Sequence, residues 1–176
     1  MTISLRLDRI EETQGGVIHE KMYFASPLFS NMEFRYNASV VAEIRKAYPE
    51  LEVYLPQEQG DINDKSSYAD STMIAKFDTE ALLASDVVVA VLDGISIDAG
   101  VASEIGVAYH ANIPVIGLYT DSRQQGFENP KKIAALAEIG ESQFSYVNLY
   151  TIGLIKLNGV VVNDEASMIE LIGNYI

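Results

Sequence analysis

Apolar and polar residues follow two different periods along the chain, and the two periods alternate. Residues 86–93 are apolar almost throughout, which is typical of a strand covered on both faces of a sheet. Shorter apolar runs, each with a proline close to one end, predict strands at residues 22–25, 51–55 and 114–119. We expect a last strand at residues 144–148.

Between these runs the apolar residues recur every three or four positions, as on one face of a helix. Alternating strands and helices predict an α/β fold, a single domain with a Rossmann- or flavodoxin-like parallel sheet flanked by helices. We assign residues 21–176 to this domain and residues 1–20 to an N-terminal extension. The expected helices cover residues 31–48, 68–84, 99–111, 130–140, 150–157 and 164–175.

Charge and composition narrow the range of partners. Twelve Lys and Arg residues against 25 Asp and Glu residues give a net charge of −13, which repels phosphate backbones and anionic lipid. We therefore expect small neutral substrates, and neither nucleic acid nor a membrane as partner. The chain has no cysteine, which excludes disulfides and thiolate chemistry and is in keeping with a cytoplasmic protein. Because there are only two histidines, we expect acid–base or nucleophilic chemistry to fall to carboxylates.

The ligand crevice of an open parallel sheet lies beyond the carboxyl ends of its strands. Four segments of this chain follow or border predicted strands in that way: residues 25–27, 56–59, 93–100 and 120–123. Among their residues are Ser26, Gln59, Asp98 and Gly100, which we take as candidates for substrate contact. Solvation alone would also explain a polar loop residue such as Gln59.

Glu104 is the one acid in the otherwise small and apolar helix expected at residues 99–111. At helical spacing it falls in one stripe with Val101, Ile105 and Ala108, so its carboxylate is expected to be buried. Burial of a carboxylate is costly unless the group is hydrogen-bonded or has a chemical task. The helix offers neither a Lys or Arg partner nor a capping box, since Val101 has no side-chain oxygen. We interpret Glu104 as a functional residue, with a structural role as the alternative.

Three further residues carry weaker signals. Asp98 precedes the same helix, where helix capping is the simpler explanation, although capping and substrate contact are compatible. Asp78 lies in the preceding helix, whose polar face makes surface exposure the simpler explanation. Tyr23, on the first strand, would by default be a core aromatic residue.

Five short motifs gather at the expected crevice. They are Tyr23-Phe-Ala-Ser-Pro27, Tyr54-Leu-Pro-Gln-Glu-Gln59, Asp78 eight residues before Asp86-Val-Val-Val-Ala-Val, Asp98-Ala-Gly-Val-Ala-Ser-Glu104-Ile-Gly106, and Asn148-Leu-Tyr150. The Asp-x5-Glu-x-Gly element at a strand–helix junction, with the Tyr and Asp upstream, is the most specific part. Together these motifs resemble the nucleoside 2-deoxyribosyltransferase family over residues 21–153.

The resemblance implies a covalent mechanism. Glu104 would be the nucleophile that attacks C1′ of a 2′-deoxynucleoside, and a second nucleobase would then take the sugar with net retention. Tyr23 would orient Glu104, and Asp78 would be the proton donor to the base. The expected substrates are therefore 2′-deoxynucleosides and free nucleobases.

The resemblance also implies how the substrate is held. Gln59 would face the base, and Asp98 would hold sugar hydroxyls. Asn148 would reach into the site of a neighbouring subunit, so the protein would be a homo-oligomer with a shared active site. No metal or organic cofactor is implied.

Two other functions fit part of this pattern. The related 2′-deoxynucleoside 5′-phosphate N-glycosidases share the first strand and the Glu-bearing helix, but they need phosphate contacts near the first turn. Residues 26–33 of this chain contain no Arg or Lys. A non-catalytic nucleoside or nucleotide sensor is the third interpretation, in which Glu104 would be a relic.

Overall fold

A computed structural model describes residues 20–60 and 70–176 of the chain. The expected N-terminal extension, apart from its last residue, lies outside the described residues, as does most of the loop expected after the second strand. The strands are β1 (Lys21–Ala25), β2 (Glu52–Tyr54), β3 (Val87–Val91), β4 (Val115–Leu118) and β5 (Val160–Val162). The α-helices are α1 (Asn31–Ala47), α3 (Ser71–Leu83), α4 (Ala99–His110), α5 (Pro130–Ala135), α6 (Leu149–Asn158) and α7 (Glu165–Ile172). Two short 3-10 helices are η2 (Pro56–Glu58) and η3 (Ser122–Gln124).

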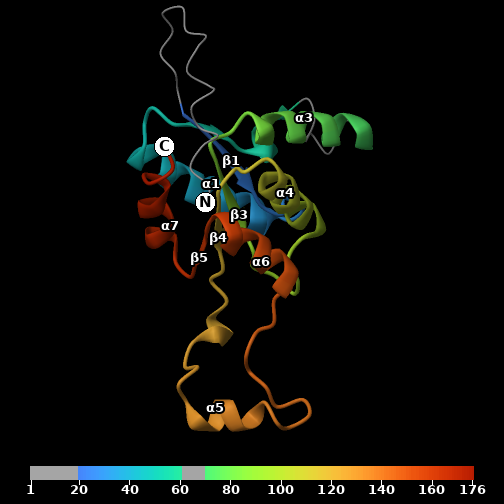
Figure 1. Cartoon of the computed structure of the whole chain (residues 1–176), viewed down its shortest axis with the longest axis vertical. Helices are drawn as coiled ribbons and strands as arrows, with labels where there is room; N and C mark the ends of the chain where they lie inside the picture. The colour runs from blue at the N-terminus through green and yellow to red at the C-terminus, as the bar shows by residue number, and fades with distance from the viewer. Residues whose placement is uncertain (1–19, 61–69) are drawn as a thin grey trace, which may run out of the picture.

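The five strands form one parallel sheet in the order β2-β1-β3-β4-β5, which confirms the predicted α/β fold (Figure 1). β1 pairs with β2 on one side and with β3 on the other, so the direction of winding reverses between β1 and β3. In doubly wound sheets, ligands bind beyond the carboxyl ends of the strands at this switch point. The topology therefore directs attention to the ends of β1 and β3.

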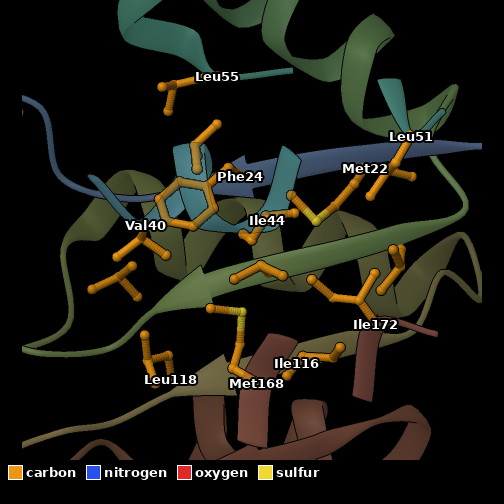
Figure 2. Close-up of a cluster of buried hydrophobic side chains, with 14 residues drawn as sticks. Met22, Phe24, Val40, Ile44, Leu51, Leu55, Ile116, Leu118, Met168 and Ile172 are labelled. Carbon is orange, nitrogen blue, oxygen red and sulfur yellow. The ribbon is translucent and has the colours of Figure 1, made fainter. Parts of the chain in front are cut away.

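Side chains of β1 alternate between two cores, one on each face of the sheet. Met22 and Phe24 pack with α1 and α7, in the cluster shown in Figure 2. Tyr23 and Ala25 point to the other face, where they pack with residues of α3, α4 and α6. All four side chains are fully buried. β1 therefore contributes to both cores at once.

The last strand differs from the prediction. Residues 144–148 form no strand, and the fifth strand is instead β5, which pairs with β4 through Ile116 and Val160. β5 has only three residues between two helices, too short a run for its period to stand out. Gly159 lies just before it, where an added Cβ would lie 2.0 Å from the carbonyl oxygen of Val115. The absence of a side chain is what lets the chain approach β4 there.

Residues 121–148, which we call the arm, project from the sheet and carry α5 at their far end (Figure 1). α5 ends at Ala135, earlier than the predicted residue 140. Large apolar side chains of the arm are exposed, among them Phe127 at 67%, Ile139 at 104% and Tyr146 at 73%. Nevertheless, no helix in the described part of the chain is long and apolar enough to cross a membrane.

The close approach at Gly159 generates a stability prediction. Gly159→Ala should lower the free energy of unfolding by about 3 kcal/mol, because the new methyl group meets backbone atoms that cannot move aside. Gly153→Ala is the matched control, since Gly153 lies inside α6 with no atom within 4 Å of an added Cβ. It should raise stability by about 0.5–1 kcal/mol. Urea unfolding of both variants measures the difference, and equal effects would contradict this account of the β4–β5 contact.

Candidate active site

A hydrogen bond between β1 and α4 lies at the centre of the site. The hydroxyl of Tyr23 donates to Oε1 of Glu104 over 2.6 Å. Tyr23 is fully buried on β1, an inner strand of the sheet. Glu104 lies on the second turn of α4, next to Ile105, which belongs to the same core as Tyr23. A hydroxyl bonded to a carboxylate at this distance makes a strong, charge-assisted contact.

A second tyrosine–carboxylate pair lies beside the first. Tyr54 is the register partner of Tyr23 across the β1–β2 ladder, and the two rings stack with centroids 5.3 Å apart and planes 15° apart. The hydroxyl of Tyr54 donates to Oδ1 of Asp78 on α3 over 3.1 Å. The stacked rings thus tie two carboxylates on different helices to two adjacent strands.

Burial and negative charge give Glu104 an unusual acidity. The pKa of Glu104 is raised from the ordinary value of 4.5 to about 7, chiefly by burial. The hydrogen bond from Tyr23 lowers this pKa, whereas the charges of Asp78 and Asp98 raise it further. The pKa of Tyr23 is raised far above its ordinary value by burial and by Glu104 and Asp78. Tyr23 therefore stays protonated as a donor, whereas Glu104 populates both its acid and its carboxylate form near neutral pH.

Asp98 is the N-cap of α4, as the spacing alone favoured. Its Oδ2 accepts from the backbone N–H groups of Gly100 at 2.8 Å and Val101 at 3.2 Å. A Cβ at position 100 would lie 2.9 Å from that same oxygen, so a glycine leaves room for the carboxylate. The cap holds Asp98 at the start of the helix that carries Glu104.

A pocket of about 480 Å³ opens beside Tyr54. Gln59 lies on its wall, at the end of η2, and its Nε2 donates to the carbonyl of Leu55 at 3.5 Å. The full lining is Tyr54, Glu58, Gln59, Gly60, Phe77, Glu80 and Ala81. Tyr54 therefore belongs both to the pocket wall and to the carboxylate pair.

Two expected site residues stand apart from this hydrogen-bonded group. Ser26 directly follows β1 and is buried, and its hydroxyl has no hydrogen-bond partner within the described residues. Asn148 is exposed and caps α6, with its Oδ1 accepting from the backbone N–H of Thr151 at 3.1 Å and from the Thr151 hydroxyl at 3.3 Å. Within its own chain, the structure gives Asn148 a capping role.

Tyr54 is the residue that sequence reasoning did not single out, although it falls in one of the quoted motifs. No local pattern marks it, because its role depends on the register that pairs it with Tyr23 across β1 and β2. Across residues 20–60 and 70–176, no cluster of three or more His, Cys, Asp or Glu residues could hold a metal ion. The site itself offers the carboxylates of Glu104 and Asp78, each bonded to a tyrosine hydroxyl, and such groups suit nucleophilic and acid–base chemistry.

The raised pKa of Glu104 predicts a pH-dependent stability. The folded chain binds a proton more tightly than the unfolded chain at this residue, so stability should fall as pH rises from about 4.5 to about 7. Glu104→Gln removes this penalty and should be more stable than the parent by on the order of 2 kcal/mol at pH 8, but not at pH 4. Chemical unfolding at the two pH values measures this, with Glu43→Gln on the exposed face of α1 as control. An equal effect of Glu104→Gln at both pH values would contradict the prediction.

A comparison with family models identifies one family for this chain. Residues 22–171 match the family described as nucleoside 2-deoxyribosyltransferase. A crystal structure of a conserved protein from Enterococcus faecalis V583 is 60% identical, with a TM-score of 0.85 over 90% of this chain and 100% of that one. A comparison with curated proteins gives no match.

Two more distant structures share the fold. The 2-deoxyribosyltransferase from Bacillus psychrosaccharolyticus is 19% identical, with a TM-score of 0.56 over 84% of this chain and 89% of that one. The enzyme from Leishmania mexicana is 17% identical, with a TM-score of 0.61 over 89% of this chain and 99% of that one. Since the family match covers most of the described sheet and its helices, the chain belongs to the nucleoside 2-deoxyribosyltransferase family.

Proposed function

We propose that this protein transfers 2-deoxyribose from one nucleobase to another through a covalent intermediate on Glu104. Family membership supports chemistry at the N-glycosidic bond of deoxynucleosides, by transfer or by hydrolysis. The observation that carries the proposal is the partly buried carboxylate of Glu104, which accepts from the Tyr23 hydroxyl at 2.6 Å beside the β1–β3 switch point.

In the first half-reaction the carboxylate of Glu104 bonds to C1′ while the C1′–N bond breaks. The electron pair of that bond stays with the leaving base, and Asp78 in its acid form gives a proton to the base nitrogen. Positive charge that develops on the sugar is stabilised by the neighbouring negative charge of Glu104. Tyr23 donates to Oε1 and so fixes the carboxylate relative to C1′.

In the second half-reaction an incoming base attacks C1′ from the side that the first base left. Its nitrogen forms the new bond, Glu104 leaves as a carboxylate, and the proton displaced from the base returns to Asp78. Two inversions give net retention, the logic of retaining glycosidases with a nucleobase in place of water. In this scheme Asp98 binds sugar hydroxyls, Gln59 faces the base, and Ser26 and Gly100 line the sugar side.

Local charge favours nucleosides over nucleotides as substrates. The carboxyl groups of Asp78, Asp98 and Glu104 lie together, and those of them that are ionised repel a 5′-phosphate. The described cations around the neighbouring pocket are paired already, Arg45 with Glu58 at 2.7 Å and Lys76 with Glu80 at 3.9 Å.

The assay that tests the proposal compares two substrates. With thymidine and adenine the protein should produce deoxyadenosine, whereas a deoxynucleoside 5′-monophosphate should release little base. With a deoxynucleoside and no acceptor, an acid quench followed by intact mass spectrometry should find protein carrying one deoxyribosyl group. Release of base from the monophosphate alone would support hydrolysis instead.

Variants of Glu104 identify the attachment site. Glu104→Gln should lose base exchange by at least about 10³-fold, because an amide is a poor nucleophile, and it should carry no deoxyribosyl group. Glu43→Gln, on the exposed face of α1, is the control and should be labelled like the parent. Labelling of Glu104→Gln would contradict the assignment.

We also propose that the protein is a homo-oligomer in which Asn148 contributes to the site of a neighbouring subunit. Asn148 is the last residue of the arm and lies between exposed apolar side chains. Tyr146 is 73% exposed, Leu149 81% and Tyr150 77%. Apolar surface of this kind marks protein–protein contacts, and a symmetric partner would cover it.

A mixing experiment tests the shared site. Asn148→Ala and Glu104→Gln should each be inactive or nearly so when expressed alone. When the two variants are co-expressed, mixed oligomers should contain sites with both native residues, and part of the activity should return. Light scattering measures the number of subunits, and a monomer would contradict the proposal. A mixture that forms mixed oligomers but stays inactive would contradict it as well.

A further inference from the structure

Tyr54 makes two contacts that place it between the two carboxylates. Its hydroxyl donates to Oδ1 of Asp78 at 3.1 Å, and its ring stacks on Tyr23 at a centroid distance of 5.3 Å. Tyr23 in turn donates to Glu104. A continuous chain of contacts therefore runs from Asp78 on α3 through two strands to Glu104 on α4.

We propose that Tyr54 is a positioning residue, whose hydroxyl holds Asp78 for proton transfer to the leaving base and whose ring fixes Asp78 relative to Glu104. The inference rests on the proposed function and goes beyond it, because it assigns the alignment of the acid to a residue that need not touch the substrate.

The hydrogen bond suits a group that becomes charged during the reaction. Because Tyr54 donates to Oδ1, the proposal assigns the transferable proton of the acid form to Oδ2 of Asp78. As that proton moves to the base nitrogen, negative charge grows on Asp78, and a hydroxyl donor binds the charged form more strongly. Burial and the charge of Asp78 raise the pKa of Tyr54 well above its ordinary value, so Tyr54 keeps its proton throughout.

The ring stack suits the need to place two reacting groups on opposite sides of one bond. Aromatic pairs at this separation are favourable beyond their burial and restrict each other's rotation. Tyr23 is fully buried and cannot turn, so it serves as the fixed partner. Loss of the Tyr54 ring would free Asp78 and also loosen the surroundings of Glu104.

The chain contains a matched control for the hydroxyl. Tyr36 on α1 donates to Oε1 of Glu165 on α7 over 3.0 Å, a tyrosine–carboxylate bond of nearly the same length between two elements. α1 and α7 pack on the face of the sheet opposite to Tyr23. Tyr36→Phe thus removes the same group from the same kind of contact away from the site.

The decisive experiment compares base release from two substrates that differ in their need for a proton. The base of 2′-deoxyguanosine needs protonation to leave, whereas that of 7-methyl-2′-deoxyguanosine already carries a positive charge. If the parent chain prefers pyrimidines, 2′-deoxyuridine and 5-fluoro-2′-deoxyuridine, whose base is the better leaving group, replace this pair. Tyr54→Phe should lower kcat for the ordinary substrate by about 10- to 100-fold, part of the effect typical of a general acid, with little change in KM. With the activated substrate the loss should be much smaller.

A second variant separates the ring from the hydroxyl. Tyr54→Leu removes the stack and should slow both substrates, because Glu104 is then affected as well. Tyr36→Phe should behave like the parent with both. An equal loss on the two substrates in Tyr54→Phe, or no loss at all, would overturn the inference. A parent chain that turns over none of these deoxynucleosides would instead overturn the proposed function.

Discussion

The contact between a buried tyrosine hydroxyl and a carboxylate is the constraint on which this site depends. Tyr23 can reach Glu104 because β1 lies next to β3 at the switch point and α4 follows β3 in the chain. The same burial that fixes the tyrosine removes water from the glutamate and raises its pKa to about 7. The position of Glu104 and its raised pKa therefore have one cause, the packing of α4 on the sheet.

Much of the fold could be predicted from the sequence, and the missed elements have physical reasons. The apolar run at residues 86–93 and the proline-bordered runs around it correspond to four of the five strands. β5 was missed because a three-residue strand between helices has no period to detect, and its pairing depends on the close approach at Gly159. Residues 144–148 are apolar enough for a strand, but they belong to the arm and pair with none of the five strands of the described sheet.

The part of the site that could be predicted is the residue that differs in character from the rest of its own helix. Glu104 stood out because its helix has no other acid, and the structure places it against Tyr23 and near Asp78 and Asp98. Tyr54 could not be singled out in the same way. Its role depends on the register between β1 and β2, which pairs it with Tyr23, 31 positions earlier in the chain. It also depends on a hydrogen bond to Asp78 on α3, further along the chain. Such pairings are set by tertiary packing and leave no local pattern.

The alternation of side chains along β1 has a consequence for how this protein can change over time. Met22 and Phe24 interlock with α1 and α7, whereas the proposed chemistry lies wholly on the side of Tyr23. Replacements among the aliphatic residues behind the sheet alter how firmly the molecule holds together without displacing a reacting atom. The core formed with α1 and α7 can therefore accept substitutions more freely than the core around Tyr23, which the proposed chemistry constrains. Laboratory evolution of thermal stability can use that first core.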